Sequence, residues 1–234
     1  MIFLEILSYL VEHYRKYISL FYFAKNMKLI GKGLQYRVYD IGGGRVRKFE
    51  TTCTQKFLTL LGWYFPKRDI LRIPKDIRDS FEITNDSISW LKRNADIIPN
   101  AILGNVKYLE GNGYEQDKAQ PLIKYFNSHS NEENAKAIEG YAVLILLCWS
   151  KGFSDIVFNY LVNAGVNNAG AVVLIDIGEI SHNKNDVKKI VAEKKWLTQS
   201  SYSQFTKNSL KSVIKEIFDK KFTVEALEKN WPKD

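Results

Sequence analysis

A carboxylate follows a run of five apolar residues and is the first candidate for chemistry in this chain. Residues 171–175 are rich in β-branched side chains, which predicts a fully buried strand that ends at Asp176. An ionised carboxylate at the end of a buried strand is costly unless a cation meets it. We therefore expect Asp176 to hold a metal ion. The alternative is an aspartate that merely opens a β-turn towards Gly178.

Two glycines near the start of the chain could approach phosphate groups. Gly31 and Gly33, with Lys32 between them, follow a short predicted strand and precede a second one over residues 36–41. A dinucleotide-binding loop needs a helix after its glycines, so that the helix N-terminus faces the pyrophosphate. Because a strand follows here, the loop belongs to an antiparallel hairpin that would fold over phosphates as a flap. Without a Cβ, the glycine backbone can come close to phosphate oxygens.

A lysine on the next strand strengthens the expectation of a phosphate site. The turn Gly42-Gly43-Gly44 leads into a third predicted strand over residues 45–49, which carries Lys48 in a Val-x-Lys pattern. The ammonium of Lys48 could lie on the α- and β-phosphates of a nucleotide. A glycine hairpin followed by such a strand is more specific than two glycines alone.

Together these motifs resemble the protein-kinase-like superfamily. The resemblance rests on Ile30-Gly31-Lys32-Gly33, Val38-Tyr39, Val46-Arg47-Lys48, Asn163 and Asp176-Ile177-Gly178. It implies ATP and Mg²⁺ as cofactors, with Gly31, Lys32, Gly33 and Lys48 on the phosphates and with Asn163 and Asp176 on the metal. The chain departs from the kinase pattern at Tyr36, where the third glycine is expected, so the flap should be stiffer than usual.

The resemblance also implies a carboxylate for the lysine and a hinge for the adenine. In kinases a helix glutamate pairs with the strand lysine, and Glu82 is the only glutamate between Glu50 and Glu110. We therefore expect Glu82 to pair with Lys48. Backbone groups around Gln116, at the junction of two lobes, would meet the adenine edge.

The position of a catalytic base is ambiguous in the sequence. Asn163 precedes Asp176 by 13 residues, which matches the kinase asparagine by resemblance, but the residue five positions before it is Phe158. The nearest carboxylate is Asp155. It serves as the base if the loop is three residues longer, or it caps a short helix and there is no base. The first reading gives a phosphotransferase; the second gives a pseudokinase that binds nucleotide or a protein partner without catalysis.

The pattern of elements predicts a two-lobed α+β fold. We expect an amphipathic helix over residues 1–26, an amino lobe with a small antiparallel sheet over 27–118, and a mainly helical carboxyl lobe over 119–234. The expected helices cover 54–65, 86–95 (opened by Asn85 or Asp86), 130–149 (opened by a Ser130–Glu133 capping box), 185–196, 209–218 and 224–231. The other expected strands cover 101–109 and 114–118, around a turn at 111–113.

Composition bounds the partners of this chain. Its 234 residues carry a net charge of +8, which favours phosphorylated ligands, polyanions or an anionic membrane surface. We see no nucleic-acid-binding motif, so nucleic acid is an unlikely partner. The N-terminal helix fits docking on the domain, or alternatively peripheral membrane contact. Two distant cysteines fit a reducing, cytoplasmic location. After residue 180 there is no Ala-Pro-Glu platform for a peptide, which leaves a small molecule or one dedicated protein as substrate.

Overall fold

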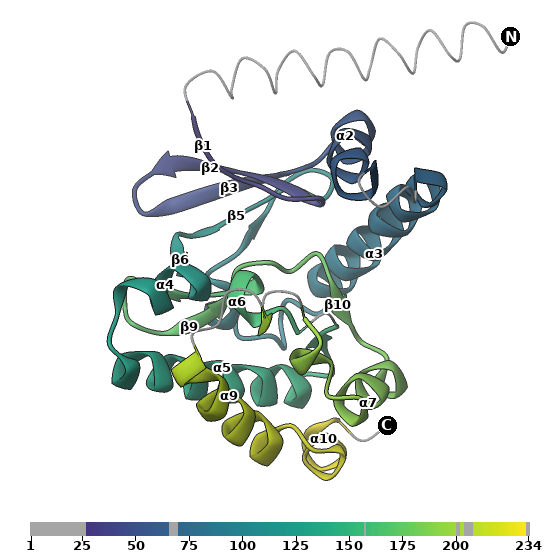
Figure 1. Cartoon of the computed structure of the whole chain (residues 1–234). Coiled ribbons are helices and arrows are strands. Elements are labelled where there is room, and N and C mark those ends of the chain that lie inside the picture. Colours follow the sequence, from purple (N-terminus) through teal and green to yellow (C-terminus); the bar gives the residue numbers. More distant parts are fainter. Residues whose placement is uncertain (1–26, 66–69, 157, 200–201, 204–207, 233–234) are drawn as a thin grey trace, which may run out of the picture.

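The computed structural model describes residues 27–65, 70–156, 158–199, 202–203 and 208–232, which form an α+β fold. A small antiparallel sheet with helices α2 and α3 makes up the upper part in Figure 1, and the other helices make up the lower part. The predicted α+β class is confirmed, and the arrangement is compatible with two lobes. The helix expected over residues 1–26 lies outside the described residues.

The main sheet has five antiparallel strands in the order β1-β2-β3-β5-β4. The predicted glycine turn is confirmed, because Gly42, Gly43 and Gly44 all have positive φ, a conformation that glycine adopts without a Cβ penalty. The strands are β1 (Lys28–Lys32), β2 (Tyr36–Gly42), β3 (Arg45–Glu50), β4 (Lys107–Tyr108) and β5 (Tyr114–Asp117).

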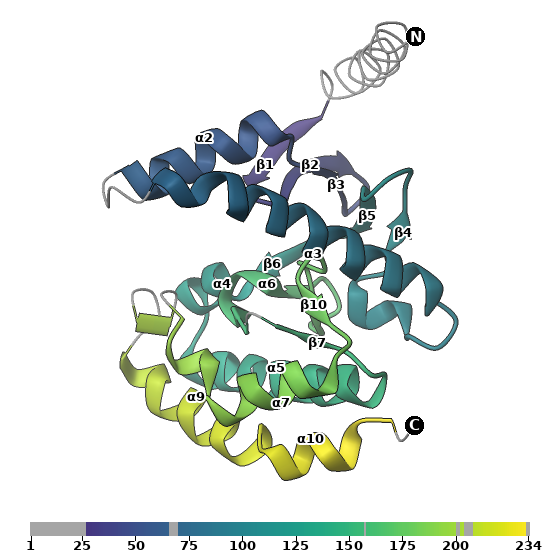
Figure 2. The ribbon, with the colours of Figure 1, turned by 90° about the vertical axis from the view of Figure 1, so that its right-hand side faces the viewer.

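Two helices between β3 and β4 pack against each other beside the sheet (Figure 2). Helix α2 (Cys53–Tyr64) begins at a capping box from Thr52 to Gln55, and α3 (Ile73–Arg93) follows the short 3-10 helix η2 (Ile70–Arg72). The helix predicted over 54–65 is confirmed. The prediction that a helix starts at Asn85 or Asp86 is wrong, because the helix already begins at Ile73, with proline in its first turn.

The strand predicted over residues 101–109 is largely wrong. Residues Asn100–Leu103 form the 3-10 helix η3, and two successive residues, Gly104 (φ 65) and Asn105 (φ 54), then adopt left-handed backbone, which interrupts an extended chain. Only β4 is extended. The apolar side chains of Ile102 and Leu103 are buried, so the apolar run reflects burial and not a strand.

The lower part begins with two helices, α4 (Leu122–Ser128) and α5 (Asn131–Ser150). The predicted capping box is confirmed, because the Ser130 side chain accepts from the Glu133 N–H and the Glu133 carboxylate accepts from the Ser130 N–H. The helix stops before Gly152, whose φ is +77.

Two further small sheets follow α5. Strand β7 (Ser154–Asp155) pairs with β10 (Ile180–Ser181), and β6 (Ala119–Pro121), β8 (Ala164–Asn167) and β9 (Val172–Leu174) form a three-stranded sheet. The buried strand predicted before Asp176 is confirmed as β9, and Asn167 turns the β8–β9 hairpin by accepting from the N–H groups of Ala169 and Ala171. The one-turn helix α6 (Tyr160–Asn163) lies between β7 and β8.

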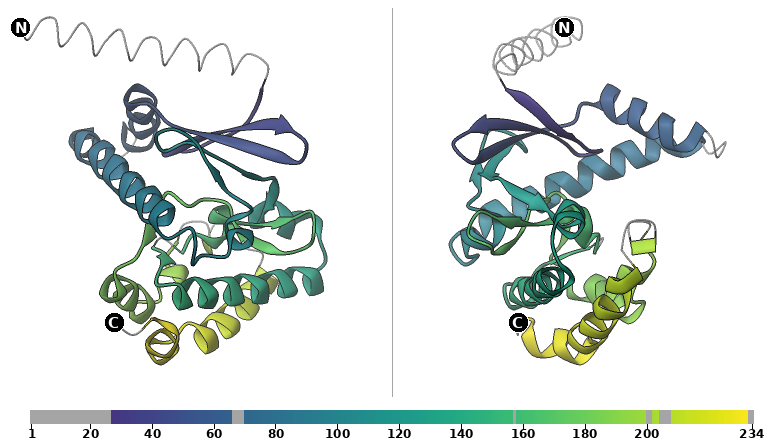
Figure 3. Two further views of the ribbon diagram at one scale, coloured as in Figure 1. Left: turned by 180° about the vertical axis from the view of Figure 1, so that it is seen from behind. Right: turned by 60° about the vertical axis from the view of Figure 1, so that its left-hand side comes forward.

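Helices of the C-terminal region close the lower part (Figure 3). They are α7 (Lys184–Ala192), η4 (Lys195–Leu197), α9 (Asn208–Lys221) and α10 (Val224–Asn230). Their buried aromatic side chains join those of α5 in one cluster that includes Tyr141, Trp149, Phe158, Trp196, Phe218 and Phe222.

In the described part of the chain, no helix is long and apolar enough to cross a membrane. Both cysteines are free thiols: Cys53 is exposed on α2 and Cys148 is buried in α5.

Candidate functional site

A cavity of about 1060 Å³ lies between the main sheet and the β6–β8–β9 sheet. Its walls come from the β1–β2 hairpin, β3, the segment that follows β5, α4 and the β8–β9 hairpin. The lysines on its walls are Lys32, Lys48, Lys118 and Lys124, so the cavity is suited to an anionic ligand. All of the cofactor-binding residues predicted from the sequence line it, except Glu82.

The glycine hairpin forms one wall and is fixed to the end of β3. Gly31, Lys32 and Gly33 all line the cavity. The Thr51 hydroxyl donates to the Gly33 carbonyl (3.2 Å) and the Thr51 N–H donates to the Gln35 carbonyl (2.7 Å). The hairpin tip is therefore tied to its own sheet by two hydrogen bonds.

Tyr36, at the position where the resemblance led us to expect a third glycine, joins this hairpin to the segment after β9. Its ring is buried and lies 5.1 Å edge-on from the ring of Tyr114. A Cβ built on Gly178 would lie only 2.8 Å from the Tyr36 Cε2 atom. Gly178, the glycine of the Asp-Ile-Gly triplet, therefore packs directly against the Tyr36 ring, and a side chain at this position would clash with it. The predicted stiffness of the flap is consistent with this packing.

Lys48 reaches across the cavity to the residue before Asp176. Its side chain is buried, and its ammonium donates to the backbone carbonyl of Ile175. Burial lowers the pKa of Lys48 to about 8, although the nearby Asp176 carboxylate opposes this change. A phosphate group beside Lys48 would oppose it further and hold the ammonium charged.

The prediction that Glu82 pairs with Lys48 is wrong. The Glu82 side chain is 68% exposed on the outer face of α3 and lies 3.9 Å from Arg78, one helical turn earlier. Helix α3 presents Ser80, Thr84 and Ser87 to the interior, so it has no carboxylate on that face. The carboxylate that acts on Lys48 belongs to Asp176.

A second buried lysine, which sequence reasoning missed, lies beside this site. Lys56 on α2 is fully buried; its ammonium donates to the Ser80 hydroxyl (2.9 Å) and lies 3.7 Å from the Glu50 carboxylate. It also acts electrostatically on Glu179. The sequence contained a sign of this burial, because Lys56 is the sole charged residue in the otherwise uncharged stretch that forms α2.

Glu179 is a strongly perturbed carboxyl group near Asp176. Burial, and then the charges of Asp176 and Asp155, raise the pKa of Glu179 to about 8, against a hydrogen bond from Gln35 and the charge of Lys56. A carboxyl group that keeps its proton at neutral pH is a hydrogen-bond donor as well as an acceptor. Such perturbed groups gather at functional sites.

Gln116, where we expected the hinge, and the two residues after it already use their hydrogen-bond donors within the fold. The Gln116 amide donates to the carbonyls of Leu103 (3.2 Å) and Leu174 (3.1 Å), and thus joins β5 to η3 and β9. The next two backbone N–H groups, of Asp117 and Lys118, donate to Gly104 (2.7 Å) and Gly44 (2.8 Å). An adenine ring would therefore have to pair with other backbone groups of this segment.

The structure brings Asp155, Asn163 and Asp176 together behind the cavity. The Asn163 amide donates to the Asp155 carboxylate (3.2 Å), and the Asn163 carbonyl accepts from the N–H groups of Ile175 (2.8 Å) and Asp176 (3.1 Å). Asp155 and Asn163 are buried, whereas Asp176 is half-buried. Of the three, Asp176 is the most exposed.

Asp155 does not cap a helix as the second sequence interpretation expected, because α6 begins at Tyr160 with Asn159 at its N-cap position. The Asp155 carboxylate instead accepts from the N–H of Phe158 (3.2 Å) in the loop before α6, and only 1% of the residue is exposed. Phe158 has a φ of 49 and a fully buried ring, which packs on Trp196 and Phe222. The position where a kinase would carry its base is thus an aromatic anchor of the lower part.

Among the described residues, no three His, Cys, Asp or Glu side chains gather in a way that could hold a metal ion. Mg²⁺ in nucleotide sites is held by one or two protein oxygens together with phosphates and water. The half-buried Asp176 carboxylate and the Asn163 amide oxygen fit that smaller requirement, because the amide nitrogen is already bonded to Asp155.

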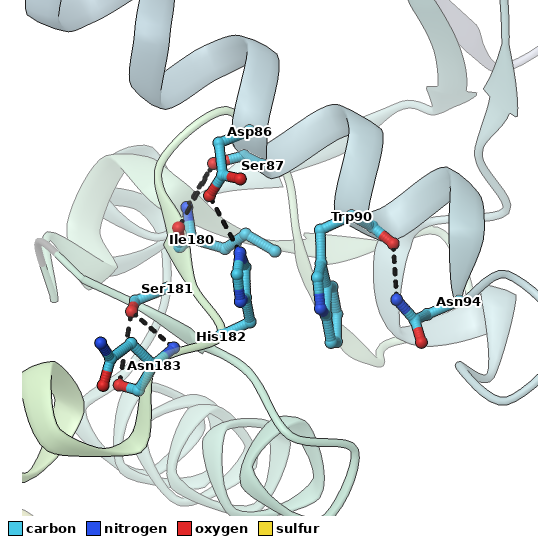
Figure 4. Close-up of polar contacts among 8 residues, drawn as sticks. All are labelled: Asp86, Ser87, Trp90, Asn94, Ile180, Ser181, His182 and Asn183. Atoms are coloured by element: carbon cyan, nitrogen blue, oxygen red, sulfur yellow. Dashed lines mark hydrogen bonds and ion pairs between the residues drawn. The ribbon is translucent and has the colours of Figure 1, made fainter.

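The segment after Asp176 is bound to α3 by a set of polar contacts (Figure 4). The Ser87 hydroxyl accepts from the N–H of Ile180 (3.1 Å) and lies 3.3 Å from its carbonyl. His182 bonds to Asp86 (3.0 Å) and stacks parallel to Trp90, with ring centroids 5.4 Å apart. Since β10 pairs with β7, these contacts connect α3 to the strand that carries Asp155.

In comparisons with known proteins, no protein-family model and no curated protein matches this chain.

Proposed function

We propose that this chain is an ATP- and Mg²⁺-dependent phosphotransferase of the protein-kinase-like type, acting on a small molecule or on one dedicated protein. The observation that carries the proposal is the meeting of Lys48 and Asp176 beneath the glycine hairpin. Lys48 comes from β3 and donates to the carbonyl of Ile175, directly before Asp176. Lys48, the cation for the phosphates, lines the cavity, and its bond to Ile175 brings it close to Asp176, the carboxylate for the metal.

The order of the elements supports the same proposal. A five-stranded antiparallel sheet with helices between its third and fourth strands is followed by α5, by β7 and by the β8–β9 hairpin that ends at Asp176. This is the sequence of parts that the resemblance to kinases implies. The glycine hairpin and the segment after β5 both line one cavity.

Each residue has a role in this proposal. Gly31 and Gly33 let the hairpin backbone approach the phosphates, and Lys32 and Lys48 neutralise them. Asp176, with the Asn163 amide oxygen, would hold Mg²⁺, which when bound neutralises charge on the phosphates. Asp155 is the candidate base, and its carboxylate would need to turn from Phe158 and Asn163 to reach a substrate hydroxyl.

A binding role without catalysis is the second candidate, and it has an observation of its own. Asp155 is buried and bonded to two neighbours, and Phe158 fills the usual position of the base. A pseudokinase would retain the cavity, Lys48 and Asp176 but would have no accessible carboxylate for the acceptor.

Transfer of label from γ-labelled ATP in the presence of Mg²⁺ separates the two candidates. A phosphotransferase consumes ATP, by autophosphorylation, slow hydrolysis or transfer to an added acceptor. Loss of a general base slows such a step by about 10²–10⁴-fold, so Asp155→Asn should lower the rate by that factor. ATP consumption that is absent in the natural chain, or equal in Asp155→Asn, would contradict a catalytic role for Asp155.

A further inference from the structure

The cavity that holds the proposed nucleotide site is larger than one ligand requires. Its volume is about 1060 Å³, whereas a pocket that encloses a single drug-sized ligand measures about 300–1,000 Å³. The main sheet supplies one part of its lining, and α4, from the lower part of the fold, supplies another (Figure 1). The cavity therefore has room for a second ligand beside a nucleotide.

Helix α4 brings a cation that the proposed nucleotide site does not use. Lys124 lies on α4, lines the cavity and is exposed to solvent. Lys32 and Lys48, which neutralise the phosphates in the proposed function, come from the main sheet instead. Among the described residues, Lys124 has no ion-pair partner. Its charge is therefore available to a ligand.

The charges on the cavity lining do not cancel. Four lysines line the cavity, whereas Asp117 is the one acidic side chain among the described residues that line it. The Asp117 carboxylate pairs with Arg45 (2.7 Å), and the Lys118 ammonium pairs with Asp40 (2.6 Å). Both of these carboxylates are engaged, and neither neutralises Lys124.

The acidic residues that follow α4 along the chain do not neutralise it either. Glu132 pairs with Lys136 (2.7 Å), and the Glu133 carboxylate accepts from the N–H (2.8 Å) and the hydroxyl (2.7 Å) of Ser130. Neither glutamate lines the cavity. An anionic ligand beside α4 therefore meets a positively charged lining.

A histidine directly after α4 offers a hydrogen-bond acceptor to the same space. His129 lines the cavity, and its ring stacks on the Tyr125 ring with centroids 3.7 Å apart. Its Nδ1 atom lies 2.9 Å from the Tyr125 carbonyl, which can only accept, so Nδ1 carries the proton. The neutral ring then presents Nε2 as an acceptor, which suits a ligand hydroxyl. We call Lys124, Tyr125 and His129 the α4 wall.

The α4 wall is joined to the helix that carries Asn163. Helix α4 packs against α6, and Val162 of α6 also lines the cavity. Helix α6 ends at Asn163, whose amide donates to the Asp155 carboxylate (3.2 Å). Through α6, a ligand on the α4 wall would extend towards the candidate base.

We propose that the α4 wall binds the phosphoryl acceptor, and that this acceptor is a small hydroxyl compound that already carries a phosphate or carboxylate group. Lys124 would hold the anionic group, and His129 Nε2 would accept from a hydroxyl. This inference rests on the proposed function. In the transfer step the acceptor oxygen bonds to the γ-phosphorus and the bond from that phosphorus to the β–γ bridging oxygen breaks. ADP then leaves, and the hydroxyl proton passes to Asp155.

Thermal unfolding with three related probes tests the proposal. The probes are glycerol 3-phosphate, glycerate and glycerol, added at constant ionic strength to the full chain saturated with Mg²⁺ and AMP-PNP, a non-hydrolysable ATP analogue. A ligand of the folded state raises the melting temperature by mass action, and the dose dependence gives its Kd. We expect at least one anionic probe to bind at least about tenfold more tightly than glycerol. The tighter of the two anionic probes identifies the group as phosphate or carboxylate.

Lys124→Gln should weaken binding of that anionic probe by about tenfold, because it removes a charge-assisted contact. The matched control is Lys229→Gln, which removes the same charge at an exposed position of α10 and should leave the Kd within about twofold. Equal Kd values for the three probes, or an unchanged Kd in Lys124→Gln, would overturn the proposal. Anion binding that AMP-PNP abolishes would assign Lys124 to the nucleotide and would overturn it as well.

The same titrations separate this proposal from the proposed function. Stabilisation by AMP-PNP without a Lys124-dependent anion site would retain the nucleotide site and overturn the acceptor inference. Anion binding that depends on Lys124, in a chain that AMP-PNP does not stabilise, would overturn the phosphotransferase and with it the acceptor role.

Discussion

Lys48 and Glu179 show how burial sets the chemistry of single residues in this protein. Both groups have pKa values near 8, reached from opposite directions: the lysine is lowered and the glutamic acid is raised. In each case the larger cause is the loss of water around the charged form. A bound polyphosphate would stabilise the charged form of Lys48. Without such a ligand, the Asp176 carboxylate compensates the burial of this charge only in part.

Glu179→Gln should change how stability depends on pH. An unfolded glutamic acid ionises near 4.5, whereas the folded Glu179 holds its proton to about 8. Between these pH values the folded state binds more protons, so the free energy of unfolding falls as pH rises. Glutamine cannot ionise and removes this fall. Relative to the natural chain, the variant should gain a few kcal/mol between pH 5 and pH 9, measured by urea unfolding.

The exposed Glu216 on α9 provides the control for this measurement. Glu216→Gln should shift the unfolding free energy by less than about 0.5 kcal/mol at either pH. If Glu179→Gln gave the same difference from the natural chain at pH 5 and at pH 9, the buried, protonated state of Glu179 would be refuted.

Single residues also mark the limit of sequence reasoning. Asp176, Asn163 and Lys48 were found because they stand at the ends or on the faces of recognisable strands, and the structure brings them close together. Glu82 failed because sequence order says nothing about which face of a helix a residue occupies. Lys56 was missed because a buried lysine is rare and was read as one surface charge among many.

At the scale of elements, the glycine hairpin and the Asp-Ile-Gly segment form one packed unit. Gly178→Ala would set a methyl group 2.8 Å from the buried ring of Tyr36 and 3.2 Å from the Gln35 side chain. Because neither neighbour is free to retreat, we expect a loss of about 1–3 kcal/mol in the free energy of unfolding.

Gly62→Ala on α2 is the matched control, since a Cβ there meets nothing within 4 Å. This change in an exposed helix should stabilise the protein by roughly 0.5–1 kcal/mol. Chemical denaturation of both variants measures whether each change lowers or raises the free energy of unfolding. A neutral or stabilising Gly178→Ala would show that the hairpin does not pack on this segment.

Ser87 is the buried side chain through which α3 holds the segment after Asp176. Ser87→Ala would remove the partner of the Ile180 N–H at a buried position. A buried donor left without its acceptor costs about 1–3 kcal/mol. Ser89→Ala, at an exposed position of the same helix, should cost less than about 0.5 kcal/mol. Equal effects of the two changes in thermal unfolding would contradict the role given to Ser87.

Local signals predicted many of the elements, and tertiary context decided the rest. The glycine turn, the Ser130 capping box and the strand before Asp176 have mechanisms that act within a few residues, and all three are confirmed. The strand expected over 101–109 failed because burial, and not periodicity, explains its apolar residues. Helix α3 begins earlier than predicted because its polar inner face, with Ser80 and Thr84, conceals the helical pattern.

At the scale of the whole molecule, the cavity lies where the two halves of the fold meet. Two ion pairs connect β2 and β3 to the end of β5 and the residue that follows it: Arg45 with Asp117 (2.7 Å) and Lys118 with Asp40 (2.6 Å).

The central claim, a Mg²⁺-dependent nucleotide site at Asp176, is tested most directly by thermal stability with ATP, with and without Mg²⁺. A ligand at 100 times its Kd stabilises the folded state by about 2.7 kcal/mol, which is roughly 5–10 °C for a chain of this size. We expect that rise only with Mg²⁺, its loss in Asp176→Ala, and its retention in the exposed control Asp186→Ala. No rise in any condition, or an equal rise in Asp176→Ala, would contradict the account.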